Sequence, residues 1–278
     1  MTTIAAQRPA TQGTRRQPHV VADAITMLRR SLLHLARYPG LTVYVIGAPV
    51  VFLLLFVFVF GGTLGAGLPG VDPGGGREAY VAYVLPGILA MTIAGTAGGA
   101  ATTVAMDMTE GITARFRTMA ISRAAVLAGH VLGNTIQAMI GIAVVLGVGL
   151  LVGFRPTAGP IDWIAAVGVL ALIAFAISWL AVAMGMQAKS AETATNLPML
   201  LLLLPFLGSG FVPTESMPEW LQWFAQNQPF TPFIETIRGL LLGSPLGWNP
   251  VLALGWCVAI TVVGYAWSMA IYERKSVR

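Results

Sequence analysis

The sequence predicts an all-α membrane protein with six transmembrane helices, and three observations lead to that fold class. Of the 278 residues, 56% are hydrophobic and only 10% are charged, whereas about 25% of the residues in a soluble domain are charged. The apolar residues lie in long blocks, and about 20 of them are enough for a helix to cross a bilayer. The basic residues gather at the chain ends and in short loops, without the basic and aromatic stripe that would predict a nucleic-acid partner.

Six segments are apolar and long enough to be candidate membrane spans. The first is rich in Phe, Val and Leu, which favours contact with lipid, and the fifth is interrupted by Pro198 and Pro205. None carries an ionisable residue near its middle, where an ion-coupled carrier usually binds its coupling ion. The six predicted spans are 41–60, 80–106, 126–153, 163–186, 197–212 and 250–271.

The distribution of positive charge predicts the orientation of these spans. Six spans put both termini on one side, where 13 of the 16 Lys and Arg residues also fall. Because positively charged loops stay in the cytoplasm, we expect a multi-pass protein of the plasma membrane with both termini cytoplasmic. The N-terminal residues lack the apolar core of a signal peptide. The predicted domains are a disordered cytoplasmic tail (1–19), an amphipathic interface helix (20–40), the six-span domain (41–272) and a cytoplasmic tail (273–278).

Small residues and side-chain amides mark the second and third spans. Gly95 and Gly99 form a G-x-x-x-G pattern in the second span, and a similar pattern in the third is followed by Asn134 and Gln137. Small residues let helix backbones approach closely, and amides can form hydrogen bonds between helices. The pattern fits either ordinary packing within the chain or a subunit seam or pathway wall. The candidate seam or pathway positions are Gly95, Gly99, Pro198 and Pro205.

Two short amphipathic helices are expected on the cytoplasmic side. Between the second and third spans, Ile112, Phe116 and Met119 follow the spacing of one apolar helical face, with Asp107 as the expected N-cap. This basic helix could lie among anionic headgroups or fit a cleft in a soluble partner. Before the first span, residues 20–40 form a second such helix, which can lie flat in the interface. Its apolar face includes Leu28 and Leu32, and its arginines are Arg29, Arg30 and Arg37.

The segment between the fifth and sixth spans is expected on the outer side. Pro218 begins a short helix whose aromatic residues, Trp220 and Phe224 among them, are typical of an interfacial belt. A second helix follows Pro229, with Thr231 as its expected N-cap and Pro232 as its first residue. It continues over residues 233–242 to Gly243 and is about 15 Å long, so it should enter the membrane and return rather than cross it. Within it, Glu235 and Arg238 are spaced to neutralise each other. The alternative is an external interfacial helix.

Three stretches of the chain, 36–62, 107–133 and 211–243, resemble the membrane subunits of type-2 ABC exporters, especially the daunorubicin-resistance-like permeases. The resemblance implies that a separate ATPase subunit binds beneath the permease and moves it through the short helix after the second span. It also implies that paired extracellular re-entrant helices help to close the outer exit. Ala120 departs from the resemblance, since related chains often have proline there.

The resemblance assigns roles to individual residues. The ATPase-coupling residues would be Thr109, Ile112, Arg115, Phe116, Arg117, Met119 and Arg123. The interface helix would include Leu28, Arg29, Arg30, Leu32 and Arg37. The extracellular re-entrant gate would include Pro218, Trp220, Phe224, Pro229, Pro232, Glu235 and Arg238.

The predicted function is the permease subunit of an ATP-driven exporter that moves amphipathic drugs, lipids or other hydrophobic cargo. The chain has no G-x-x-x-x-G-K-[ST] pattern, which a phosphate-binding loop needs, so ATP and Mg²⁺ are expected on a partner ABC ATPase and no cofactor on this chain. Six spans form half of a two-fold transporter, so a second permease copy, identical or not, is expected. The alternatives are an ion-coupled carrier and a membrane-embedded enzyme. For the enzyme, the only close acid–imidazole cluster is Asp107, Glu110 and His130, which matches no catalytic arrangement.

Overall fold

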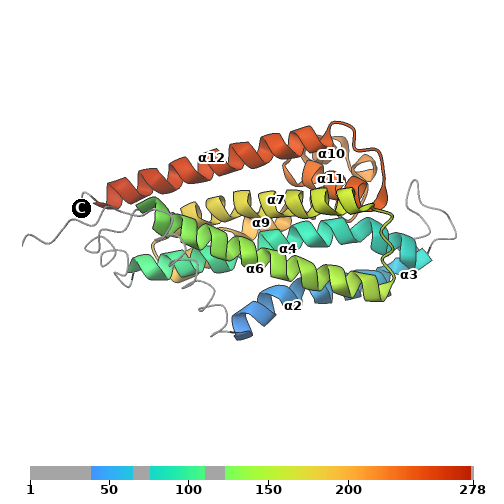
Figure 1. The fold of residues 1–278 in the computed structure, drawn as a ribbon, viewed down its shortest axis with the longest axis horizontal. Coiled ribbons are helices and arrows are strands. Elements are labelled where there is room, and N and C mark those ends of the chain that lie inside the picture. The colour runs from blue at the N-terminus through green and yellow to red at the C-terminus, as the bar shows by residue number, and fades with distance from the viewer. Residues whose placement is uncertain (1–38, 65–75, 110–122, 277–278) are drawn as a thin grey trace, which may run out of the picture.

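The computed structural model describes residues 39–64, 76–109 and 123–276, and every regular element in these ranges is helical. Four helices lie along an elongated bundle (Figure 1). They are α4 (Gly76–Thr109), α6 (Arg123–Val152), α7 (Pro160–Gln187) and α12 (Asn249–Ser276). In the described ranges, these four are long and apolar enough to cross a membrane. The second, third, fourth and sixth predicted spans are therefore confirmed as helices, with ends that differ by a few residues.

The first predicted span is helical but irregular. It consists of α2 (Pro39–Leu55), a π-helical turn (Phe56–Phe60) and α3 (Gly61–Leu64). Pro39 and Gly40, which were expected to end the interface helix, are the first described residues of α2. The rest of the predicted interface helix, including all its named residues, lies outside the described residues.

The fifth predicted span is broken into short pieces, as its prolines indicated. It begins directly after α8 (Ala191–Asn196) and contains the whole of α9 (Met199–Leu203) and a series of turns that continues to Val212. Pro198 caps α9 and Pro205 follows its last turn; neither can donate the backbone hydrogen bond that would continue a helix. The count of six spans stays a prediction, because this segment is not one membrane-length helix.

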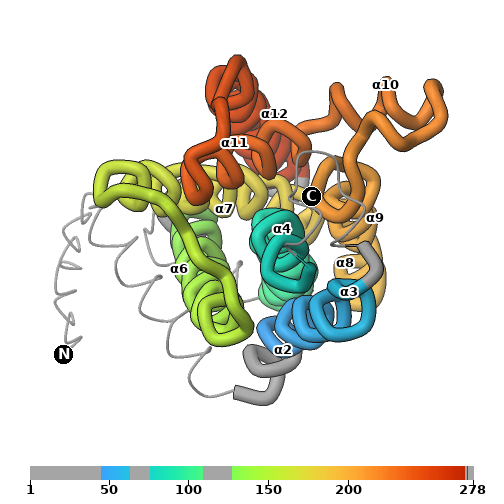
Figure 2. Tube along the Cα trace, turned by 90° about the vertical axis from the view of Figure 1, so that its right-hand side faces the viewer, coloured from blue at the N-terminus to red at the C-terminus, as the bar shows by residue number. Residues whose placement is uncertain are grey.

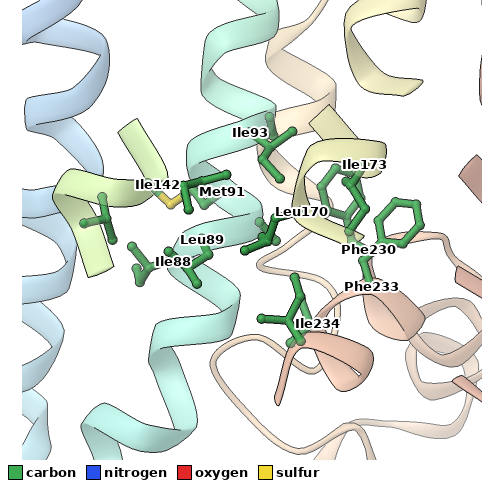
Figure 3. Close-up of a cluster of buried hydrophobic side chains, with 14 of the residues drawn as sticks. Ile88, Leu89, Met91, Ile93, Ile142, Leu170, Ile173, Phe230, Phe233 and Ile234 are labelled. Atoms are coloured by element: carbon green, nitrogen blue, oxygen red, sulfur yellow. The ribbon is translucent and has the colours of Figure 1, made fainter. Parts of the chain in front are cut away.

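Helix α4 is the centre of the bundle, and Figure 2 shows it surrounded by α2, α3, α6, α7, α8 and α9. In Figure 3, its side chains Ile88, Leu89, Met91 and Ile93 meet Ile142 of α6 and Leu170 and Ile173 of α7. The same cluster includes Phe230, Phe233 and Ile234 of α11 (Phe230–Leu242). Helices in a membrane associate mainly through such close packing. This core therefore fixes the position of α11 against α4 and α7.

The two ends of the bundle contain different elements. At one end of the bundle, α4, α7 and α12 stop and α6 begins. We call this end the proximal end; it lies on the left in Figure 1. The opposite end, the distal end, holds α10 (Glu219–Asn227), α11 and the connection from α6 to α7. The two residues that flank the predicted coupling helix, Thr109 and Arg123, and the predicted re-entrant segment thus lie at opposite ends of the bundle.

Candidate functional site

The first part of the candidate site is α11, a short helix embedded in the distal end. It packs against α4, α7 and α12, and ten of its 13 residues are buried. Its chain arrives from α10 and leaves toward α12 at the same end of the bundle (Figure 1). A short helix with both connections at one end, set among longer helices, has the arrangement expected of a re-entrant segment.

The boundaries of α10 and α11 follow the sequence closely, with one correction. Pro218 caps α10 and Pro229 caps α11, and Gly243 ends α11 with a left-handed φ of 68°, which glycine adopts without steric cost. Thr231 was expected to be the N-cap of α11, and this is wrong. The amide of Phe230 donates to Oε1 of Gln228 at 3.2 Å, so the glutamine side chain satisfies an amide of the first turn. Pro232 consequently lies within that turn.

Arg238 connects α11 to two other segments. As expected from their spacing, it forms an ion pair with Glu235 through Nη1 and Oε1. Its Nη2 also donates to the carbonyl oxygen of Tyr83 in α4 at 3.1 Å and to that of Ser209 at 2.8 Å. The guanidinium carbon lies 4.2 Å from the centre of the Tyr83 ring, within the range of a cation–π interaction.

Two glycines allow the segments around Arg238 to meet. A Cβ added to Gly87 would lie 2.5 Å from the carbonyl oxygen of Gly210, closer than atoms can approach. The backbones of α4 and of the turn after α9 are therefore in direct contact. The sequence analysis did not single out these glycines, although Gly87 directly follows Pro86 in α4 and Gly210 ends a Gly-Ser-Gly tripeptide.

The second part of the candidate site is an open stripe on the proximal half of α4. Gly95, Gly99 and Thr102 are half-buried, and Met106 is exposed. A Cβ added to Gly99 would meet no atom within 4 Å, and one added to Gly95 would meet only the Leu202 side chain at 3.9 Å. The G-x-x-x-G pattern therefore makes no close contact with any other described part of the chain.

Helices α8 and α9 border this stripe. The hydroxyl groups of Thr102 and Thr195 are 2.8 Å apart, which joins α4 to α8. Beside them, Met199 and Leu200 of α9 are 60% and 69% exposed. Small residues next to exposed apolar side chains form the kind of surface that a second helix can cover in a membrane.

The third part is a polar connection inside the bundle. Nδ2 of Asn134 in α6 donates to the hydroxyl of Ser178 in α7 at 2.8 Å and, at 3.4 Å, to that of Thr96 in α4. This confirms the expectation that an amide of the third span bonds across helices. Nearer the proximal end, Nε2 of His130 lies 3.2 Å from Oδ2 of Asp107, which joins the end of α4 to the start of α6.

The predicted coupling residues lie almost entirely outside the described residues. Residues 110–122 are not described; Thr109 is the last residue of α4 and Arg123 the first of α6. Asp107 was expected to be the N-cap of the basic helix, and this is wrong because α4 continues past it to Thr109. Its carboxylate is instead paired with His130. Ile112, Arg115, Phe116, Arg117 and Met119 keep their predicted role without a structural test.

Comparison with known proteins agrees with this arrangement. Residues 23–242 match the family model described as ABC-2 type transporter. The chain is 28% identical to the "Daunorubicin resistance ABC transporter permease protein DrrB1" of Streptomyces coeruleorubidus, over 98% of this chain and 91% of the relative. It is also 28% identical to the "Probable doxorubicin resistance ABC transporter permease protein DrrC" of Mycobacterium tuberculosis, over 86% and 85% of the two chains. The matched family region runs from before α2 to the last residue of α11 and so includes each part of the candidate site. The chain belongs to the ABC-2 type transporter family, as a membrane-embedded permease.

Proposed function

We propose that this permease is the membrane subunit of an ATP-driven exporter, which moves amphipathic drugs, lipids or other hydrophobic cargo out of the cytoplasm or the inner leaflet. The observation that carries the proposal is the family match over residues 23–242. The names of two relatives, which refer to daunorubicin and doxorubicin resistance, support a drug as cargo. ATP and Mg²⁺ would bind to a separate ABC ATPase.

The proximal end would face the cytoplasm and bind that ATPase. The positive charge of the loops on this side supports the orientation, with the protein in the plasma membrane and both termini in the cytoplasm. Residues 109–123 would form the coupling helix, and α4 and α6 enter and leave it at the same end of the bundle. Because Asp107 and His130 join these two helices at 3.2 Å, a force on the loop would act on α4 and α6 together.

The pathway would form between two permease copies along the open stripe of α4. Gly95 and Gly99 leave room for a second helix, and the exposed apolar residues of α9, between Pro198 and Pro205, continue this surface. At the distal end, α10 and α11 would close the exit. Trp220 and Phe224 of α10 are 75% and 38% exposed, which fits a position in the outer headgroup region.

The test is a charge reversal in the coupling helix. The permease is co-expressed with a candidate ABC ATPase from the same genome, and Arg115→Glu/Arg117→Glu is compared with Lys189→Glu, an exposed cation on the same predicted side. We expect the double variant to reach the membrane but to lose about tenfold or more of its drug efflux, because truncating or reversing charges at an interface often costs several kcal/mol. The Lys189 variant should retain efflux.

Two results would contradict the proposal. Full efflux and full ATPase stimulation in the double variant would remove the coupling role from residues 109–123. ATP-independent uphill transport by the purified permease on an ion gradient would replace the exporter by an ion-coupled carrier.

A further inference from the structure

The guanidinium of Arg238 is held by groups from three segments. Its side chain is 11% exposed, and that of its ion-pair partner Glu235 is 28% exposed. Two of its hydrogen bonds go to main-chain carbonyls, those of Tyr83 and Ser209, which are 155 and 29 residues away in the chain. Every residue has a main-chain carbonyl, so these two hydrogen bonds depend on where the backbone lies and not on the side chains of Tyr83 and Ser209.

The carbonyl of Ser209 lies outside regular backbone hydrogen bonding, and that of Tyr83 lies next to a carbonyl that has lost its helical donor. Tyr83 is one residue after Ala82, and the carbonyl of Ala82 loses its helical donor because Pro86 has no N–H group. Ser209 lies in the turns after α9, outside any helix. Buried backbone carbonyls need donors, and a single planar guanidinium can supply two or more in fixed directions. Arg238 therefore stabilises α4 near its proline and the turn after α9 at once.

The backbone contact between Gly87 and Gly210 restricts the movement of α4 relative to the turn after α9. A Cβ added to Gly210 would lie 2.9 Å from the carbonyl of Pro205 and 3.2 Å from Ile234 of α11. One added to Gly208 would lie 2.4 Å from Nε2 of Gln228. The turn is thus packed against its own first residues at Pro205, against α4 at Gly87 and against α11. We call this group of contacts, centred on Gly87, Gly210 and Arg238, the distal joint.

We propose that Arg238 is the positioning residue of the re-entrant gate: it fastens α11 to the distal part of α4 and to the turn after α9, so that the three segments hold the exit closed as one unit. The inference rests on the proposed function of α11. Lysine cannot replace arginine here, because an ammonium is a point charge without the rigid, planar set of donors. Glu235 balances the charge from the same helix and does not connect segments.

The experiment compares Arg238→Met and Arg238→Lys with Arg155→Met. Arg155 is a matched control because its Nη1 also donates to two main-chain carbonyls, those of Leu150 and Phe154. Both carbonyls are within five residues of Arg155 in the chain, so these hydrogen bonds do not join distant segments. The reporter is Thr236→Cys, at a position of α11 that is 1% exposed, in a Cys257→Ala background that removes the chain's native cysteine. A membrane-impermeant maleimide is added from outside without ATP.

We expect both Arg238 variants to label about tenfold faster than the parent, because local opening exposes buried positions. Their drug efflux should fall about tenfold while ATPase stimulation stays within about twofold, since the ATPase binds at the other end of the molecule. Arg155→Met should match the parent in all three measurements. If Arg238→Lys has the same effect as Arg238→Met, the effect comes from the loss of the directed hydrogen bonds, because lysine keeps the positive charge.

Parent-like labelling and efflux in Arg238→Lys would overturn the proposal, and this variant decides the matter if Arg238→Met does not accumulate. Loss of efflux without faster labelling would also overturn it. Absence of ATP-driven efflux in the parent would instead contradict the exporter function, and the labelling comparison, which needs no transport, would still test the distal joint.

Discussion

The two halves of α4 are both buried against α7, but they differ on one side of the helix. In the distal half, Tyr80, Val84, Leu85 and Ile88 have no exposed surface, and the backbone touches that of the turn after α9 at Gly87. In the proximal half, a whole stripe is half-buried or exposed, and Met106 is 46% exposed. Among the described residues, the packing of the distal half is therefore complete, whereas one side of the proximal half has no described segment packed closely on it.

This difference indicates where the molecule depends on other molecules. The distal half is covered by α2, α7 and α11 of the same chain, and Arg238 fixes that arrangement. The proximal stripe is bordered by α8 and α9, which have only six and five residues. A permease that works as a pair would need such an asymmetry, with a closed exit built by each copy and a seam near the ATPase that only two copies complete.

The largest expected effect comes from filling glycines in the two halves. Gly87→Leu places a side chain 2.5 Å from the carbonyl oxygen of Gly210, where only backbone could yield, so we expect a loss of about 3 kcal/mol or more in the free energy of unfolding. At Gly99 an added Cβ meets no described atom within 4 Å, so Gly99→Leu should change the stability of the monomer by less than about 1 kcal/mol. Thermal unfolding of detergent-solubilised protein measures both.

The same pair of variants tests the seam. If a second copy packs on the stripe, Gly99→Leu should be folded but poor in efflux, whereas Gly87→Leu should be scarce in the membrane. Equal stability of the two variants would contradict the contrast between the two halves of α4.

The sequence predicted the long helices well because their signal is local. Each of the four membrane-length helices in the described residues shows as a block of apolar residues, and the prolines at 198 and 205 indicated the break in the fifth segment. The limits of α10 and α11 followed from Pro218, Pro229 and Gly243 in the same way. In each case a few neighbouring residues determine the backbone.

The sequence could not predict contacts that join distant segments. G-x-x-x-G patterns drew attention to Gly95 and Gly99, but neither glycine makes a close backbone contact with the described residues. Such contacts occur instead at Gly87 with Gly210, 123 positions apart, at Gly185 with Ala101 and at Gly264 with Trp179 and Leu180. A glycine pattern does not say whether its partner helix belongs to the same chain. Likewise, the spacing of Glu235 and Arg238 predicted their ion pair, while the carbonyl groups that Arg238 binds in α4 and after α9 have no sequence signature.

A smaller effect is expected where the two halves meet, at Asn134. Its hydrogen bond to Ser178 contributes about 0.6 kcal/mol by comparison with similar bonds in membrane proteins. Its Oδ1 is buried without a partner, which costs about 1–3 kcal/mol. The hydroxyls of Ser178 and Thr96 keep their own bonds to Ala174 and Ile93 when the amide is removed. Asn134→Leu should therefore leave the stability unchanged or raise it by about 1–2 kcal/mol.

Thr135→Val is the control for Asn134→Leu, because the neighbouring hydroxyl bonds only to the carbonyl of Val131 in its own helix. It should have almost no effect on thermal unfolding. A loss of stability in Asn134→Leu that Thr135→Val does not share would mean that Oδ1 has a partner, such as a bound water, and that the amide stabilises the junction.

The smallest effect is expected on the proximal side, at Thr102. Its hydroxyl lies 2.8 Å from that of Thr195 and also 2.8 Å from the carbonyl of Gly98, and the Thr195 hydroxyl is 3.0 Å from the carbonyl of Ala191. Two hydroxyl protons cannot serve three contacts at once, so the link between α4 and α8 competes with bonds inside each helix. Thr102→Val should lower the free energy of unfolding by less than about 0.5 kcal/mol. Thr103→Val, whose hydroxyl bonds only to Gly99, is the control. A loss of about 2 kcal/mol for Thr102→Val alone would mean that the bond to α8 holds α4 as strongly as Arg238 does at the distal joint. The proximal half would then be stable within one chain, without a second copy.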